Sequence, residues 1–364
     1  MNRSNLQGRT KCWKGLIGNI GIISVGMTFL SALSSLLLPP GAQANPYLAK
    51  PGERPVTLRI ATCAVSGGFV HLYTALDNSL FDKYGLKLEH IFLRGDSVSL
   101  AALSADEIQF LYCAADATLP GLATGIEARL VAAPLVKLPY VLVGRKDISR
   151  PEELKGKTIG VSRPGDLSGR LSRALLKKFN LTTDEVPIRP IGGSQSERYR
   201  AMVANVIQAI IVTPPLDVRA KKDGFNVIYR LIDLDIPFIY SSVHANSKIL
   251  RERPETVQRI VAAFAEAVHF VEKNPDKAKA SIAKTMKVRD EESLQVSYTV
   301  YAKEIVDRRM TVPGKEVAEA VELAREGGTK VKKKAEELYD NSFTANLEKS
   351  GFLKELWGSE WQKY

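Results

Sequence analysis

The chain has 364 residues, of which 45% are hydrophobic and 25% charged, so it is long enough for two globular domains and is not a disordered or fibrous chain. Its formal net charge is +11, but the basic residues are spread along the sequence, which does not indicate a nucleic-acid partner. The densest basic run, residues 330–334, is followed by two glutamates after one alanine and fits a solvated helix face. We expect a monomer that binds no nucleic acid.

The first 44 residues have the order of a secretory signal peptide. Four basic residues precede an uncharged run over residues 15–38, and Ala42-Gln43-Ala44 then has the A-x-A form of a cleavage site. This order predicts a signal peptide over residues 1–44 and a periplasmic or otherwise extracytoplasmic protein. The run exceeds the usual signal core of about 7–15 residues, so a retained membrane anchor is the alternative.

A turn-rich leader over residues 45–55 is followed by alternating strand and helix signals. Residues 56–63 are rich in β-branched side chains and predict a strand; a Gly-Ser loop and a helix to about Phe81 follow. Residues 86–92 alternate in the manner of a second strand. This order is typical of the βαβ units of a parallel sheet.

The stretch over residues 95–116 is repeated at residues 193–215 with the shared pattern Ala-x-x-Ala-(Asp/Asn)-x-Ile-Gln-x-aliphatic. Each copy predicts a Ser-capped helix, a turn at Asp106 or Asn205, and a short buried strand. Asp and Asn tolerate the left-handed backbone conformation in which many helices end. The repeat therefore indicates two similar α/β lobes.

Residues 138–143 and 236–241 resemble each other, each with a proline, an aromatic residue and then apolar residues, and they bracket the second repeat. We predict that both cross between the lobes, with lobe 1 over residues 56–143 and lobe 2 over residues 144–235. Residues 236–364 then return to lobe 1 and add C-terminal helices from Pro254 onward. Two lobes joined by two crossings form a hinge with one cleft.

In an open parallel sheet, ligands bind beyond the carboxyl ends of the strands, where helices begin. The corresponding loops are rich in Gly and Ser, and converging helix N-termini favour an anionic group, although several aspartates lie in the same loops. We interpret most of these aspartates as N-caps, and the charge of the ligand stays open. The candidate ligand-binding residues are Ser66, Gly67, Phe69, Asp96, Ser97, Ala115, Asp116, Tyr140, Ser162, Arg163, Ser168, Ser194, Thr213 and Pro214.

Enzyme and metal motifs are not found in the sequence, so we expect no catalytic residues, no metal and no cofactor. The four histidines have no metal-ligand spacing, and only His71 follows a candidate loop, where a helix-surface or capping role is expected. Cys63 and Cys113 both end predicted strands; they either form a disulfide or are ordinary core residues.

Residues 56 to about 306 resemble the solute-binding proteins of ABC importers for nitrate, sulfonate, taurine and pyrimidine thiamine precursors. The resemblance lies in Leu80-Phe81-Asp82-Lys83-Tyr84-Gly85-Leu86, in Gly156-Lys157-Thr158-Ile159-Gly160-Val161 and in Pro254-Glu255-Thr256-Val257. It implies a type II periplasmic binding fold. The chain departs from the family at Gln109 and Gln208, where Asp is usual, and this weakens a ligand assignment by similarity.

The prediction is therefore an extracytoplasmic solute-binding protein and not an enzyme. It captures a small organic or anionic ligand between its lobes and delivers it to an ABC-type permease in the inner membrane. Two alternatives stay open: an enzyme on the same fold that acts on a small organic acid or heterocycle, and a sensor-type binding protein that serves a receptor.

Overall fold

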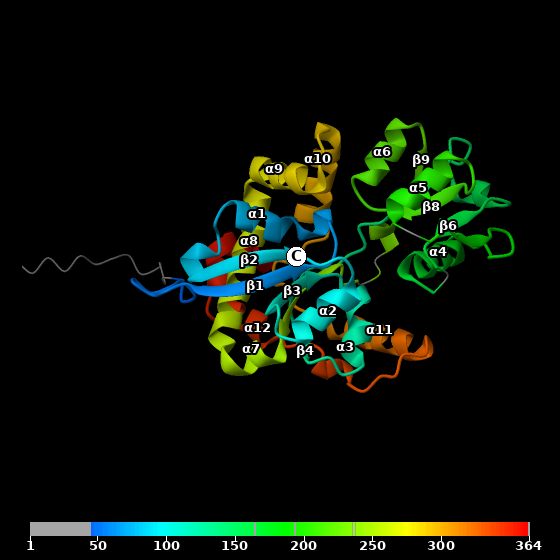
Figure 1. Ribbon diagram of the computed structural model, residues 1–364. Helices are drawn as coiled ribbons and strands as arrows, with labels where there is room; N and C mark the ends of the chain where they lie inside the picture. Colours follow the sequence, from blue (N-terminus) through cyan, green and yellow to red (C-terminus); the bar gives the residue numbers. More distant parts are fainter. Residues whose placement is uncertain (1–44, 164, 193, 235, 237, 363–364) are drawn as a thin grey trace, which may run out of the picture. The chain divides into compact units, whose positions relative to one another are not determined.

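The computed structural model describes residues 45–163, 165–192, 194–234, 236 and 238–362, so the predicted signal peptide or anchor lies outside the described residues. Two five-stranded sheets form the framework (Figure 1). The first has the order β2 (Leu86–Phe92), β1 (Val56–Thr62), β3 (Phe110–Cys113), β10 (Ser241–Asn246), β4 (Ala128–Leu135). The second has the order β7 (Ile188–Pro190), β6 (Ile159–Val161), β8 (Ala209–Val212), β5 (Val141–Gly144), β9 (Asn226–Arg230).

The two sheets match strand for strand. In each, the second strand runs parallel to both of its neighbours, and the fourth strand runs antiparallel to both of its neighbours. Both sheets are therefore mixed: the parallel sheet predicted for each lobe is present, but β10 in the first sheet and β5 in the second run antiparallel to their neighbours. Strand β5 pairs entirely within the second sheet, although residues 141–143 were assigned to lobe 1 from the sequence. The strand pairing thus puts the first crossing at about residues 136–140.

Helices cover both faces of each sheet and complete four buried clusters. One face of the first sheet packs against α1, α8, α9, α10, α12 and α13, and its other face against α2, α3 and α11. In the second lobe, α4 covers one face and α5 and α6 cover the other. The helices are α1 (Val70–Asp77), α2 (Asp96–Ser104), α3 (Ala115–Ala123), α4 (Leu167–Lys178), α5 (Gln195–Val203), α6 (Leu216–Lys222), α7 (Ser247–Glu252), α8 (Pro254–Lys273), α9 (Pro275–Met286), α10 (Glu291–Thr299), α11 (Gly314–Glu326), α12 (Ser342–Lys349) and α13 (Phe352–Trp357).

The helix that begins at Glu291 changes character in its last turns. Helix α10 ends at Thr299, and a π-helix over Val300–Glu304 continues it. Such single-turn widenings within helices occur frequently at functional sites. No helix in the described ranges combines the length and the apolar composition needed to cross a membrane.

The two crossings lie side by side and are joined by backbone hydrogen bonds. The N–H of Phe238 donates to the carbonyl of Val136 at 3.2 Å, and beside it the N–H of Tyr240 donates to the carbonyl of Leu135, the last residue of β4, at 2.8 Å. Their short length and mutual pairing make the crossings a compact joint between the lobes.

The repeated turn has the same construction in both lobes. Asp106 and Asn205 adopt the left-handed conformation, with φ of 59° and 58°, as the sequence predicts. The side-chain carbonyl of Gln109 accepts from the N–H of Arg59, and that of Gln208 accepts from the N–H of Thr158, both at 3.0 Å. The side-chain amide of each glutamine donates back to the turn residue, at 3.1 Å and 3.4 Å. These glutamines therefore tie a turn to the neighbouring parallel strand.

We predict that Gln109→Ala lowers the free energy of unfolding by about 1–2 kcal/mol, because the backbone N–H of Arg59 loses its acceptor. Urea unfolding measures the change. Glu107→Ala, at an exposed position two residues earlier, is the matched control and should change stability by less than about 0.5 kcal/mol. Equal effects of the two substitutions would contradict the assigned role of Gln109.

Candidate functional site

A cavity of about 440 Å³ lies where the strand ends of the two lobes meet. This volume lies in the usual range for small-molecule sites, about 300–1,000 Å³. First-lobe residues come from the loops after β1 and β3 and from Met286 at the end of α9; second-lobe residues come from the loops before α5 and α6; and the crossings contribute two tyrosines. The lining residues are Cys63, Ala64, Val65, Ser66, Phe69, Ala114, Tyr140, Ser194, Gln195, Ser196, Thr213, Pro214, Pro215, Leu216, Tyr240 and Met286.

In the first lobe, the loop after β1 is held by its own serine and by close aromatic contacts. The Ser66 hydroxyl accepts from the N–H of Gly68 at 3.1 Å and lies 3.2 Å from the Tyr240 hydroxyl. A Cβ on Gly67 would come within 2.2 Å of the Tyr301 ring, and a Cβ on Gly68 within 2.4 Å of the Tyr240 ring. Both positions therefore require glycine for the rings to pack this closely.

A disulfide joins Cys63 and Cys113, whose Cα atoms are 5.5 Å apart. The two cysteines follow register partners of the parallel strands β1 and β3, which accounts for their proximity. Of the two possibilities left open by the sequence, the structure therefore has the disulfide. It connects two first-lobe loops at the edge of the cavity.

In the second lobe, polar side chains hold the loops before α5 and α6 together. Ser194 caps α5 and accepts from the N–H of Glu197 at 3.3 Å, while the side-chain carbonyl of Gln195 accepts from the N–H of Thr213 at 2.8 Å. The carbonyl of Pro214 accepts from the Tyr301 hydroxyl at 3.0 Å, and this bond connects the two lobes.

Tyr140 and Tyr240 line the inner side of the cavity, and Tyr301 stacks on Tyr240 without lining the cavity itself. The rings of Tyr240 and Tyr301 are 5.9 Å apart and nearly parallel, and the rings of Tyr140 and Tyr240 are 6.0 Å apart and nearly perpendicular. Burial raises the pKa of all three hydroxyls, so they act as neutral hydrogen-bonding groups. Among the described residues that line this cavity, none is an aspartate, glutamate, lysine or arginine.

A second cavity of about 420 Å³ adjoins the first at Ala114 and Ala115 and lies between α3, α4 and α11. Its walls are largely apolar, but Asp116 and Arg170 face it from different lobes. Burial raises the pKa of Asp116 to about 6, and the positive charge of Arg170 opposes part of this rise. A carboxyl group that titrates near neutral pH therefore lies beside the cleft.

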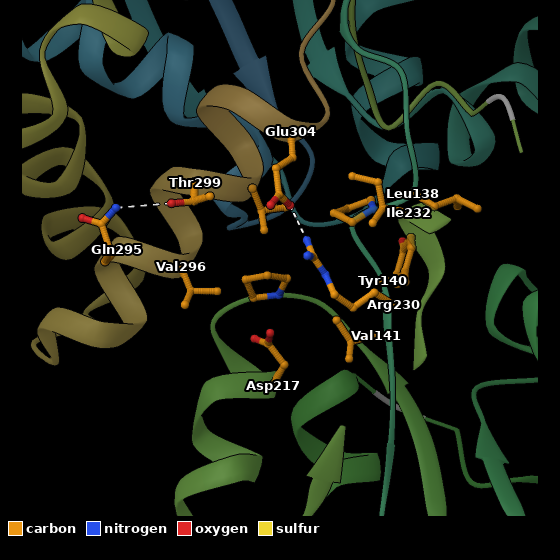
Figure 2. Close-up of a pocket in the computed structure, with 13 residues that line it drawn as sticks. Leu138, Tyr140, Val141, Asp217, Arg230, Ile232, Gln295, Val296, Thr299 and Glu304 are labelled. Atoms are coloured by element: carbon orange, nitrogen blue, oxygen red, sulfur yellow. Dashed lines mark hydrogen bonds and ion pairs between the residues drawn. The ribbon is translucent and has the colours of Figure 1, made fainter. Parts of the chain in front are cut away.

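A third cavity, of about 210 Å³, lies on the α6 and α10 side of the crossings (Figure 2). Arg230 of β9 reaches across it and forms an ion pair with Glu304 of the π-helix. Asp217, in the first turn of α6, lies on the opposite side of Arg230 from Glu304 (Figure 2). Burial raises the pKa of Asp217, and one of its carboxylate oxygens is buried without a hydrogen-bond partner among the described residues.

The structure brings together a subset of the residues predicted from the sequence. Ser66, Phe69, Tyr140, Ser194, Thr213 and Pro214 line the first cavity, and Ala115 and Asp116 line the second. Gly67 packs behind the first cavity against Tyr301. Their common role in ligand binding stays a prediction, now supported by their gathering at one place.

Five predicted residues are not among those that line these cavities: Asp96, Ser97, Ser162, Arg163 and Ser168. The Ser162 hydroxyl donates to Asp166 at 2.9 Å and lies 3.0 Å from the Ser168 hydroxyl, so these serines stabilise their own loop. The sequence shows a Ser-rich loop but not that its hydroxyls bond to one another.

The expectation that loop aspartates are N-caps is wrong in its detail. Asp96, Asp116 and Asp217 lie in the first turns of their helices, behind Gly95, Ala114 and Pro215 at the cap positions. Asp166 occupies a cap position but makes no side-chain capping bond. The Ser cap of the repeat is present at Ser194 and not at Ser97. The first-turn acids interact with the positive end of the helix dipole instead.

His71 is also placed differently from the expectation of a surface or capping residue. It is fully buried in α1, neither ring nitrogen has a hydrogen-bond partner in the described part of the chain, and burial lowers its pKa to about 3. Within the described ranges, no group of three or more His, Cys, Asp or Glu side chains is arranged to hold a metal ion.

Several residues that shape the first cavity were not among the predicted site residues, and Gln195, Met286, Tyr301 and Tyr240 are examples. Gln195 binds Thr213, Met286 closes one side, and Tyr301 stacks on Tyr240. Gln195 directly follows the predicted cap Ser194, so the sequence contains a local signal for it. Tyr301 lies in a predicted C-terminal helix more than 230 residues after Gly67, and no local signal connects the two.

Comparison with known proteins gives a consistent family and fold. A family model described as NMT1/THI5 like matches residues 67–278. A protein of Brucella abortus (strain 2308) named as a binding protein is 28% identical over 218 residues, which are 59% of this chain and 66% of the relative. A Brachyspira hyodysenteriae protein named as an ABC transporter periplasmic binding protein is 26% identical over 56% of this chain and 62% of its own length. The match thus spans less than two thirds of these relatives.

Solved structures of low sequence identity show the same fold. The periplasmic aliphatic sulphonate binding protein SsuA from Escherichia coli aligns with a TM-score of 0.62 at 18% identity, over 78% of this chain and 92% of its own. The periplasmic sulfonate-binding protein SsuA from Methylobacillus flagellatus KT aligns with a TM-score of 0.65 at 18% identity, over 84% and 97%. The predicted periplasmic binding fold with two α/β lobes is confirmed.

We predict that Asp116→Asn stabilises the protein at pH 8. The folded pKa of about 6 exceeds the ordinary value of 3.8, so the charged carboxylate lowers stability above about pH 6, and this cost disappears as the pH falls toward 4. At about 1.4 kcal/mol per pKa unit, the gain is at most about 3 kcal/mol. Urea unfolding at pH 8 and pH 4 measures it, with the exposed Asp184→Asn as control. A gain that is the same at both pH values would contradict the assignment.

Proposed function

Because the chain belongs to the NMT1/THI5-like family, with a cavity built from both lobes beside their joint, we propose that it is an extracytoplasmic solute-binding protein. It captures a small ligand between the lobes. The observation that carries the proposal is the shared lining: each lobe supplies loops from the carboxyl ends of its strands, and the crossings supply the inner wall. A ligand that touches both lobes favours their approach by its differential affinity for the closed arrangement.

The lining favours a small organic ligand with an apolar or planar body and hydrogen-bonding groups at its edge. Phe69, Tyr140, Tyr240 and Met286 provide aromatic and apolar surface, and Ser194, Ser196 and Thr213 provide hydroxyl groups. Pockets of this composition hold a ligand by its apolar area and orient it through a few polar contacts. The N-terminus of α5 adds a partial positive charge, which suits an acidic or electron-rich edge.

The role as a transport component follows from the relatives that are named as binding proteins, one of them of an ABC transporter. We propose that the loaded protein docks on an ABC-type permease from the extracytoplasmic side and is itself no enzyme. Recovery of a co-purified ligand in chemically unaltered form after incubation supports this role. Turnover of the ligand would support the alternative of an enzyme on the same fold.

We predict that a bound ligand compacts the protein. A thermal-shift screen of sulfonates, carboxylates and pyrimidines identifies a compound that raises the melting temperature. X-ray scattering with and without that compound should then show a smaller radius of gyration in its presence. A saturating compound that leaves the radius unchanged would argue against closure of the lobes.

We predict that Ser196→Trp weakens binding of the same compound at least about tenfold, because an indole side chain fills the cavity from an exposed backbone position. Arg200→Trp, one turn further along α5 and also exposed, is the matched control and should bind as the unmodified protein does. Calorimetric titration measures both affinities. Equal affinities in the two variants would place the ligand elsewhere.

A further inference from the structure

Arg230 stands between two carboxylates that belong to different lobes. Its guanidinium is paired with Glu304, the last residue of the first-lobe π-helix, and its charge also acts on Asp217, in the first turn of α6 in its own lobe. Figure 2 shows the guanidinium directed toward Glu304 and away from Asp217. Arg230 thus has two candidate partners, and in this arrangement it pairs with Glu304 of the other lobe.

Because Arg230 pairs with Glu304, the Asp217 carboxylate has no ion-pair contact with Arg230 in this arrangement. One of its oxygens is buried and has no hydrogen-bond partner among the described residues, although buried polar groups are normally satisfied. The surrounding walls are mostly apolar, with Val141, Val296 and Val300 lining the same cavity. A carboxylate oxygen that has no partner in the described part of the chain, near a cation that is engaged elsewhere, is what we expect if the two groups pair in another arrangement of the lobes.

The contacts around this cavity depend on how closely the lobes approach. Lys222 of α6 forms ion pairs with Asp290 and Glu292 at the start of α10, and the Tyr301 hydroxyl binds the Pro214 carbonyl. These contacts and the Arg230–Glu304 pair all connect α10 and the π-helix of the first lobe to the second lobe. If the lobes separate, Glu304 moves away from Arg230, whereas Asp217 stays because it lies in the same lobe.

We propose that Arg230 is a charge switch, which pairs with Glu304 when the lobes approach and with Asp217 when they part. The inference rests on the proposed function only in assuming that the lobes open and close. Because Arg230 has a carboxylate in either arrangement, opening does not leave its charge unpaired. The competition between the two acids then sets the ratio of open to closed protein before any ligand binds.

The switch predicts opposite effects for two substitutions that each remove one negative charge. Glu304→Gln removes the closed-state partner and shifts the ligand-free protein toward the open arrangement. Asp217→Asn removes the open-state partner and shifts it toward the closed arrangement. Since half-exposed ion pairs contribute little, we expect changes of about two- to fivefold in the open-to-closed ratio. The burial of Asp217 could by itself favour closure when its charge is removed, but that effect would persist without Arg230, whereas an effect of the switch requires Arg230.

X-ray scattering of the ligand-free protein measures the shift through the radius of gyration, which should rise in Glu304→Gln and fall in Asp217→Asn. To keep the fall measurable, Asp217→Asn is also introduced into Lys222→Gln, which lacks the ion pairs of Lys222 with Asp290 and Glu292 and is therefore expected to be more open. In an Arg230→Gln background, both substitutions should have no effect. Glu326→Gln, at an exposed position, controls for the change in net charge.

Shifts in the same direction, no shift in any variant, or shifts that persist without Arg230 would overturn the switch. These measurements contain no ligand, so they are independent of the ligand-induced compaction that tests the proposed function. If a stabilising compound compacts the unmodified protein but neither substitution changes the radius of gyration, the proposed binding function stands and the switch is rejected. If the two substitutions shift the radius of gyration in opposite directions but no compound compacts the protein, the switch stands and the proposed binding function is not supported.

Discussion

The backbone hydrogen bonds between the two crossings fix where the lobes of this protein meet. Phe238 binds Val136 and Tyr240 binds Leu135, so the chain that leaves the first sheet and the chain that returns to it run side by side. The tyrosines in these crossings form the inner wall of the main cavity, and the loops at the strand ends close around it. Glycines at positions 67 and 68 then follow as a requirement, because larger residues would collide with Tyr301 and Tyr240.

The cavity and the ion pairs around it have different physical characters. The described lining of the main cavity carries no acidic or basic side chain, whereas Asp116 and Arg170 face the adjoining cavity, and Arg230, Glu304 and Asp217 face the third. Charges therefore surround the proposed ligand site without lining it. This separation allows the lobes to be held together by electrostatic contacts while the ligand is recognised by shape and neutral hydrogen bonds.

The fold was accessible from the sequence because its signals are local or repeated. The paired turns at Asp106 and Asn205, the β-branched strands and the two similar crossings all depend on residues close in the chain. The site was accessible only in part. The sequence does not show that the hydroxyls of Ser162 and Ser168 bond to each other, and Tyr301 was missed because its contact with Gly67 spans most of the chain. Gln109 and Gln208, where the chain departs from the family it resembles, hold turns just before strands β3 and β8 and are not among the residues that line the cavity.

The pairing of β5 within the second sheet has a consequence for the order of folding. All five strands of that sheet come from one continuous stretch, Val141 to Arg230, whose ends are neighbours across the strand pair β5 and β9. The first sheet, in contrast, lacks its strand between β3 and β4 until residues 241–246 arrive. The second sheet can therefore form all of its strand pairs before the first sheet does. The first sheet, although it contains the earliest strands of the chain, is complete only after residues 241–246 have been added.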